Sequence, residues 1–128
     1  MKQPEAKFKK ALVEGFEATF GVKSPNTFWS YMKGTKWGVP DLFFAALGGS
    51  IWVEAKVGDN SLEKTQEGTI PRMAAGGATV WLLTSNHASK GDRVVTAHHF
   101  GRPGPDWFLQ GWKSFSTLAA WERLLLPC

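Results

Sequence analysis

Residues 39–57 read Val-Pro-Asp-Leu-Phe-Phe-Ala-Ala-Leu-Gly-Gly-Ser-Ile-Trp-Val-Glu-Ala-Lys-Val. The stretch contains two apolar, strand-like runs, 39–47 and 51–57, and Gly48-Gly49-Ser50 between them is a turn signal typical of a β-hairpin. Charged residues are rare in such runs unless they are paired or bind a metal. This hairpin nevertheless carries Asp41, Glu54 and Lys56, so we expect a functional site on it.

Strand geometry predicts how these three side chains meet. Glu54 and Lys56 are two residues apart and therefore point to the same face. An antiparallel hairpin places Asp41 within a residue or two of their level. Two neighbouring carboxylates repel each other unless a cation joins them, and their oxygens suit Mg²⁺. Such an ion activates water and polarises a phosphodiester, and Lys56 can orient that water, so the pattern predicts metal-assisted phosphodiester hydrolysis.

Length and composition narrow the class of protein. The 128 residues fit a single domain, with the core expected over about 5–100 and a C-terminal helix over about 114–126 as a lid or a dimer element. Cys128 is the only cysteine, which excludes an internal disulfide and a cysteine-based zinc site. The sequence contains no secretory signal and no stretch of membrane-spanning length. We therefore expect a cytoplasmic protein without a membrane partner.

Basic residues are concentrated in the first third of the chain. The formal net charge is +4, and residues 1–40 hold seven Lys and three Glu. A basic face beside a phosphodiesterase site is typical of a protein that binds a polyanion such as DNA. Without such a site, the same net charge would indicate only a solubilising surface. The candidate phosphate-binding residues are Lys9, Lys10, Lys33 and Lys36.

Residues 4–20 have the pattern of an amphipathic helix. Phe8, Leu12 and Phe16 form its apolar stripe, and Glu5 lies on the same stripe. A carboxylate at the end of a buried stripe could reach a metal site on the sheet. The alternative is an N-terminal acid favoured by the helix dipole.

The remaining elements are predicted from periodicity and from turn residues. Residues 24–26 are expected to cap a short helical turn through 28–31, and Trp29, Tyr31 and Trp37 could stack on bases or pack in the core. A helix is expected over 61–75, capped by Ser61 and kinked or divided at Pro71. Further strands are expected over 78–84 and 93–100.

This order of elements, with Pro40-Asp41 followed after twelve residues by Glu54-Ala55-Lys56, resembles the PD-(D/E)xK nuclease superfamily. The segment from Gly58 to Gln66 resembles the one that follows the lysine in the VRR-NUC branch. Glu5 resembles the first-helix acid of that branch and of the archaeal-type Holliday-junction resolvases, and Glu14 or Glu17 is the alternative if the helix is rotated.

The resemblance implies a fold and a site. The fold is a three-layer, restriction-endonuclease-like α/β fold with a mixed central sheet flanked by helices. Mg²⁺ or Mn²⁺ would be held by Asp41, Glu54 and the Ala55 carbonyl, with Glu5 acting through water. Lys56 would position the nucleophilic water, and Gln66 would support it.

The resemblance also implies an activity and its partners. We expect a metal-dependent DNA endonuclease selective for branched DNA such as Holliday junctions, acting as a homodimer. If the protein is phage-encoded, it would act in the cytoplasm of the host cell. The alternatives are a nicking or restriction-like nuclease on ordinary duplex DNA, and a non-catalytic DNA-binding module of the same fold.

Overall fold

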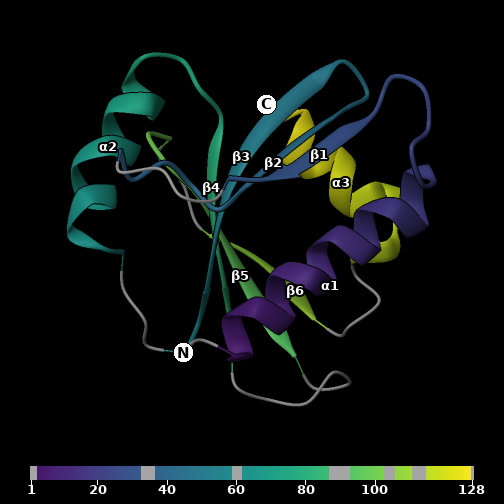
Figure 1. Cartoon of the computed structure of the whole chain (residues 1–128), viewed down its shortest axis with the longest axis horizontal. Coiled ribbons are helices and arrows are strands. Elements are labelled where there is room, and N and C mark those ends of the chain that lie inside the picture. Colours follow the sequence, from purple (N-terminus) through teal and green to yellow (C-terminus); the bar gives the residue numbers. More distant parts are fainter. Residues whose placement is uncertain are drawn as a thin grey trace.

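The computed structural model describes residues 3–32, 37–58, 62–86, 93–102, 106–110 and 115–127. Within these ranges the chain forms helices and strands in a mixed order (Figure 1). In chain order they are α1 (Gln3–Phe20), β1 (Phe28–Tyr31), β2 (Leu42–Ala46), β3 (Gly49–Val57), α2 (Lys64–Ala75), β4 (Val80–Ser85), β5 (Val94–His99), β6 (Trp107–Gln110) and α3 (Leu118–Leu125).

The strands form one six-stranded mixed sheet in the order β1-β2-β3-β4-β5-β6. Only β3 and β4, which α2 connects, are parallel; the other neighbours are antiparallel. Helices α1 and α3 lie on one face of the sheet and α2 on the other (Figure 1). The predicted three-layer α/β architecture is therefore confirmed.

The predicted hairpin is present, and its turn explains its register. Leu47 and Gly48 both have positive φ angles, 58° and 79°, and form a two-residue turn that Ala46 and Gly49 close. Positive φ at both central positions is the geometry that suits the right-handed twist of paired strands. The turn lies one residue earlier than Gly48-Gly49. The last pair of the ladder is Leu42 with Val53, so Asp41 comes directly opposite Glu54.

Two local predictions differ from the structure, and one strand was not predicted. Residues 28–31 form strand β1 rather than a helical turn, because they pair with β2 along their whole length. Helix α2 continues through Pro71, so of the two predicted alternatives, a kink or a division, the division is wrong. Strand β6 follows the Gly/Pro-rich segment and was not predicted. Its four residues are too few to show a strand pattern, and the strand forms because it pairs with β5.

One hydrophobic core lies between the sheet and the pair α1 and α3. Phe8, Leu12 and Phe16 of α1 are buried in it as their spacing predicted, and Trp121 of α3 is completely buried beside Phe16. Gly15 lets α1 approach the backbone of residue 115 closely, where a Cβ atom would meet the carbonyl oxygen at 2.3 Å. Helix α3 thus packs within its own chain, and a dimer role for its exposed side stays a prediction.

None of the helices that the structure describes has both the length and the apolar composition needed to cross a membrane.

Candidate active site

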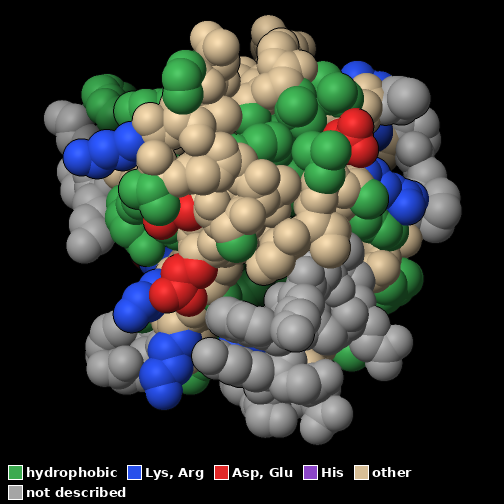
Figure 2. All heavy atoms as spheres, turned by 90° about the vertical axis from the view of Figure 1, so that its right-hand side faces the viewer, with side chains coloured by type: hydrophobic (Ala, Val, Ile, Leu, Met, Phe, Trp, Pro, Cys, Tyr) green, Lys and Arg blue, Asp and Glu red, His purple; other side chains and the backbone are tan. Residues whose placement is uncertain are grey.

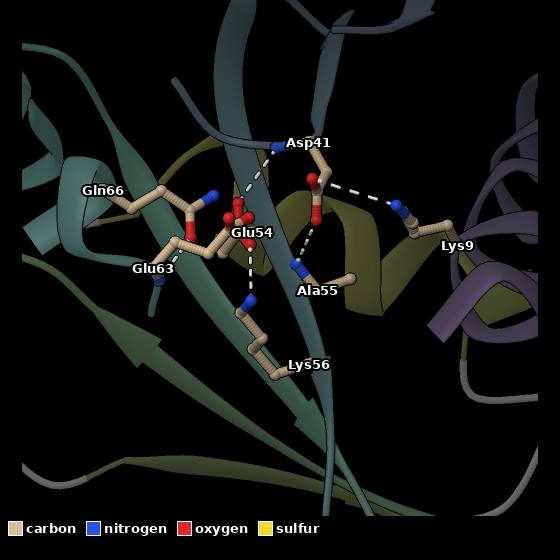
Figure 3. A network of polar contacts seen from close by, with 7 residues as sticks. All are labelled: Lys9, Asp41, Glu54, Ala55, Lys56, Glu63 and Gln66. Atoms are coloured by element: carbon tan, nitrogen blue, oxygen red, sulfur yellow. Dashed lines mark hydrogen bonds and ion pairs between the residues drawn. The ribbon is translucent and has the colours of Figure 1, made fainter. Parts of the chain in front are cut away.

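Asp41 lies at the point where β2 begins and its backbone is held on both sides. Its N–H donates to Oε1 of Glu54 at 3.1 Å, and its carbonyl accepts from the N–H of Met32 at 2.8 Å. Its carboxylate oxygen Oδ2 accepts a long hydrogen bond, 3.5 Å, from the N–H of Ala55 (Figure 3). Strand β3 continues past this level without a β2 partner, so the carboxylate occupies the position that a further β2 residue would have taken.

Glu54 and Lys56 project from β3 to the same face, as alternation predicted. Oε2 of Glu54 lies 3.3 Å from Nζ of Lys56, and both side chains are buried. Odd-numbered neighbours such as Val53 and Ala55 point to the opposite face, into the core with α1 and α3. One strand therefore supplies both the packing of the domain and two charged groups of the site.

Helix α2 covers these charged groups through Gln66. Its side-chain Oε1 accepts from the backbone N–H of Glu63 at 3.0 Å, which satisfies an otherwise unpaired donor at the start of the helix. This bond turns the amide group toward Glu54 (Figure 3), and a side-chain hydrogen bond from Gln66 lowers the pKa of Glu54. The N-cap of α2 is Glu63; Ser61, the predicted cap, lies outside the described residues.

The carboxyl group of Glu54 is electrostatically unusual. Burial, followed by the charge of Asp41, raises its pKa from 4.5 to about 7, although the Gln66 hydrogen bond and Lys56 both oppose the rise. The charged form of Glu54 is thus less stable in the protein than in water, and a bound cation would stabilise it.

The oxygen atoms around this pair suit a hard divalent cation. The Ala55 N–H faces Asp41, and the carbonyl of a strand residue points to the same side as its N–H. The Ala55 carbonyl therefore lies on the Asp41 side of β3, past the last β2 pair. Two carboxylates and one carbonyl are ligands typical of Mg²⁺ or Mn²⁺, so the residues present fit the ion that the motif implies.

Glu5 is buried near the start of α1, one helical turn before Lys9. Among the described residues, no group of three or more His, Cys, Asp or Glu side chains surrounds a common point. Glu5 is therefore not gathered with Asp41 and Glu54 into a three-acid cluster, and its role through water stays a prediction. The alternatives Glu14 and Glu17 lie further along α1, where Glu17 accepts from the indole N–H of Trp29 at 3.0 Å.

The candidate DNA-binding lysines fall in different places. Lys9 extends from α1 to the site, and its Nζ lies 3.8 Å from Oδ1 of Asp41 (Figure 3). This contact was not predicted, because it depends on how α1 packs on the sheet. Lys10 is exposed on the same helix; Lys33 and Lys36 lie outside the described residues. On the face shown in Figure 2, Lys and Arg side chains are scattered around the rim and form no single patch.

The aromatic candidates also separate. Trp29 packs against the core and donates its indole N–H to Glu17, which agrees with the expected packing role rather than with base stacking. The ring of Tyr31 packs edge-on against Trp29. Trp37 is 68% exposed, and its carbonyl accepts from the hydroxyl of Thr69 on α2. Of the three residues, Trp37 alone presents most of its side chain to solvent.

The similarity of the chain to known proteins lies in its structure. No protein-family model matches the chain, and no curated protein matches it. Among solved structures, the chain is similar to Hjc, a Holliday junction resolvase from the archaeal hyperthermophile Archaeoglobus fulgidus. The TM-score is 0.46 and the identity 12%, over 80% of this chain and 86% of that one. These values are too low to transfer an activity from that protein to this one.

Proposed function

We propose that this protein is a metal-dependent nuclease that hydrolyses phosphodiester bonds in DNA. One observation carries the proposal: Asp41 and Glu54 meet where β2 begins, and the Lys56 ammonium lies 3.3 Å from Glu54. Burying Glu54 and Lys56 beside the half-buried Asp41 is costly for a domain of this size, and packing alone gives no reason for it. A site that binds a cation and a phosphate would explain why these charged groups are placed together.

In this proposal Asp41, Glu54 and the Ala55 carbonyl hold Mg²⁺ or Mn²⁺. When bound, the ion supplies a Lewis acid and a water of lowered pKa. Lys56 hydrogen-bonds and orients the attacking water, and its charge offsets the negative charge that builds on the phosphate. Gln66 keeps Glu54 in place, and α2 excludes bulk water from the buried side of the pair.

The substrate is proposed to be branched DNA, such as a Holliday junction. The motif from Pro40 to Lys56 resembles that of structure-selective nucleases, and a single small domain leaves little surface for reading a sequence. Trp37 stands exposed at α2, close to the position of Gln66, and could stack on an unpaired base. We further propose a homodimer, because cutting both strands of a junction requires two sites.

A cleavage assay tests the proposal. The purified protein would be mixed with Mg²⁺, Mn²⁺ or EDTA and with four DNAs: a four-way junction, a flap, a linear duplex and a single strand. We expect cutting of the junction with either metal and none with EDTA. Equal cutting of duplex and junction would remove the structural selectivity, and binding without any cutting would favour a non-catalytic module. Light scattering coupled to chromatography would report the dimer.

A further inference from the structure

The acid pair has a second ammonium beside it, on the side away from Lys56. Nζ of Lys9 lies 3.8 Å from Oδ1 of Asp41, and the two side chains are only 27% and 24% exposed. Figure 3 shows Lys9 entering from α1, whereas Gln66 enters from α2 on the other side. Each carboxylate is therefore paired with its own lysine, Glu54 with Lys56 and Asp41 with Lys9.

The backbone of Lys9 is fixed by the packing of α1 on the sheet, although its side chain is long. Its neighbours Phe8 and Leu12 are buried in the core and fix this part of the helix on the sheet. The packing of the domain thus fixes the backbone of Lys9 near Asp41. The flexible four-carbon side chain still allows the ammonium to move to another partner. Lys7 and Lys10 on the same helix are exposed, so no such constraint applies to them.

The two lysines reduce the net negative charge that the two acids would otherwise present to a metal ion. With both ammonium groups in place, the four charges cancel, and a divalent ion would arrive at a site with no excess of negative charge. No third acid joins the pair among the residues described. A cation that binds Asp41 must therefore displace Lys9 or tolerate its charge nearby.

We infer that Lys9 is a resident counterion of Asp41 that competes with the divalent ion and keeps its affinity low until DNA binds. A phosphate group of the substrate offers the ammonium another partner, which frees Asp41 for the ion. Metal and DNA then bind cooperatively, at one metal ion per site. This inference rests on the proposed function, and it assigns Lys9 a role at the metal site rather than only on the DNA-binding surface.

Mn²⁺ binding, followed by the loss of the free-ion signal in electron paramagnetic resonance, tests the inference without any measurement of activity. The variants are Lys9→Gln, Lys9→Arg, which keeps the charge, and Lys7→Gln as the matched control at an exposed position of the same helix. We expect Lys9→Gln to bind Mn²⁺ roughly three- to tenfold more tightly than the original protein, because one competing charge is gone. The other two variants should bind as the original does. Adding the uncut four-way junction should tighten binding in the original protein and narrow its difference from Lys9→Gln.

The outcomes separate the two proposals. Unchanged or weaker Mn²⁺ binding by Lys9→Gln would overturn the inference, as would two ions bound per original chain. Circular dichroism and thermal melts would verify that each variant is folded. If Asp41→Asn binds Mn²⁺ as well as the original protein, or if no variant binds it, the metal site of the proposed function is itself wrong.

Discussion

The backbone N–H of Asp41 donates to the carboxylate of Glu54 at 3.1 Å, so one acid of the site holds the other in position. The bond exists because the ladder between β2 and β3 ends at Leu42 and Val53, which leaves the next N–H free to meet a side chain. It brings the buried carboxylate of Glu54 next to the half-buried carboxylate of Asp41. Their mutual repulsion has measurable consequences for pH dependence, stability and metal binding.

Metal binding should weaken sharply as the solution becomes acidic. The pKa of Glu54 is raised to about 7, and a protonated carboxyl group is a poor ligand. Below that pH we expect Mn²⁺ affinity to fall by about tenfold for each pH unit, as one proton is displaced per ion bound. Isothermal titration calorimetry from pH 5.5 to 8.5 would measure it. A flat profile across pH 7 would contradict the assigned position of the ion.

The same pKa predicts how the metal-free protein loses stability. Glu54 binds its proton more tightly when folded than when unfolded, so between about pH 4.5 and pH 7 the folded state carries more protons. The free energy of unfolding contributed by this group therefore decreases as pH rises through that window, by on the order of 2–3 kcal/mol. Other carboxylates titrate as well, so the useful quantity is a difference between variants.

Asp41→Asn supplies that difference. It removes the second cause of the raised pKa while keeping an oxygen that can accept from Ala55. In EDTA, urea unfolding at pH 5 and pH 8 should show a smaller decrease for Asp41→Asn than for the original protein. If the two proteins lose the same stability over this range, the two acids are not coupled as the structure indicates.

Lys56→Ala should abolish cleavage while leaving DNA binding largely intact. The ammonium lies in the buried interior at 3.3 Å from Glu54, where few substrate contacts outside the site can depend on it. We expect the rate of junction cutting to fall by roughly 10²–10⁴-fold, the range typical of a lost proton-transfer or orienting group. Gel-shift titration would follow binding. Lys7→Ala is the control, because Lys7 is exposed on α1 and is not among the candidate DNA-binding lysines, and an equal loss of cutting in both variants would argue against a specific role.

Gln66→Leu should raise the pH at which metal binds. The glutamine hydrogen bond lowers the pKa of Glu54, so its loss lets that pKa rise further. It also leaves the Glu63 N–H without its acceptor, at a cost of about 1 kcal/mol. The midpoint of Mn²⁺ binding should therefore shift to higher pH. Glu67→Gln, at the next and exposed position of α2, should leave the midpoint unchanged.

The sequence predicted the centre of the site well because the information there is local. Side-chain alternation places Glu54 and Lys56 on one face, and the turn between the two runs determines that Asp41 lies opposite Glu54. The turn lies one residue earlier than predicted, but Asp41 still lies within the one or two residues of register that the prediction allowed. Gln66 was identified by resemblance, and its place beside Glu54 agrees with that expectation.

The remaining features depend on contacts between distant segments. Strand β1 has only four residues, and its conformation is decided by pairing with β2, so Ser24-Pro25-Asn26 misled the prediction toward a helix. The contact of Lys9 with Asp41 requires α1 to lie across the sheet at one particular position. Periodicity shows which side of a helix is buried, but not which strand end that helix reaches.

Two glycines with similar backbone angles provide a test of how the site is assembled. Gly38 has φ +75° and lies against α2, where a Cβ atom would meet the backbone of Thr65 at 2.6 Å and the N atom of Gln66 at 2.9 Å. Gly48 has φ +79° in the hairpin turn, and nothing lies within 4 Å of its Cβ position. Alanine strains the backbone at both positions, but only at position 38 does it also collide with another element.

Gly38→Ala should therefore be the more damaging substitution. We expect Gly48→Ala to cost about 1–2 kcal/mol of stability, the usual penalty for a left-handed residue with a side chain, and to keep metal binding. Gly38→Ala should cost more, roughly 3 kcal/mol, and weaken Mn²⁺ binding, because it pushes the segment leading to Asp41 away from Gln66. Urea unfolding and Mn²⁺ titration would measure both effects. Equal losses in the two variants would mean that the close contact between Gly38 and α2 does not hold the site together.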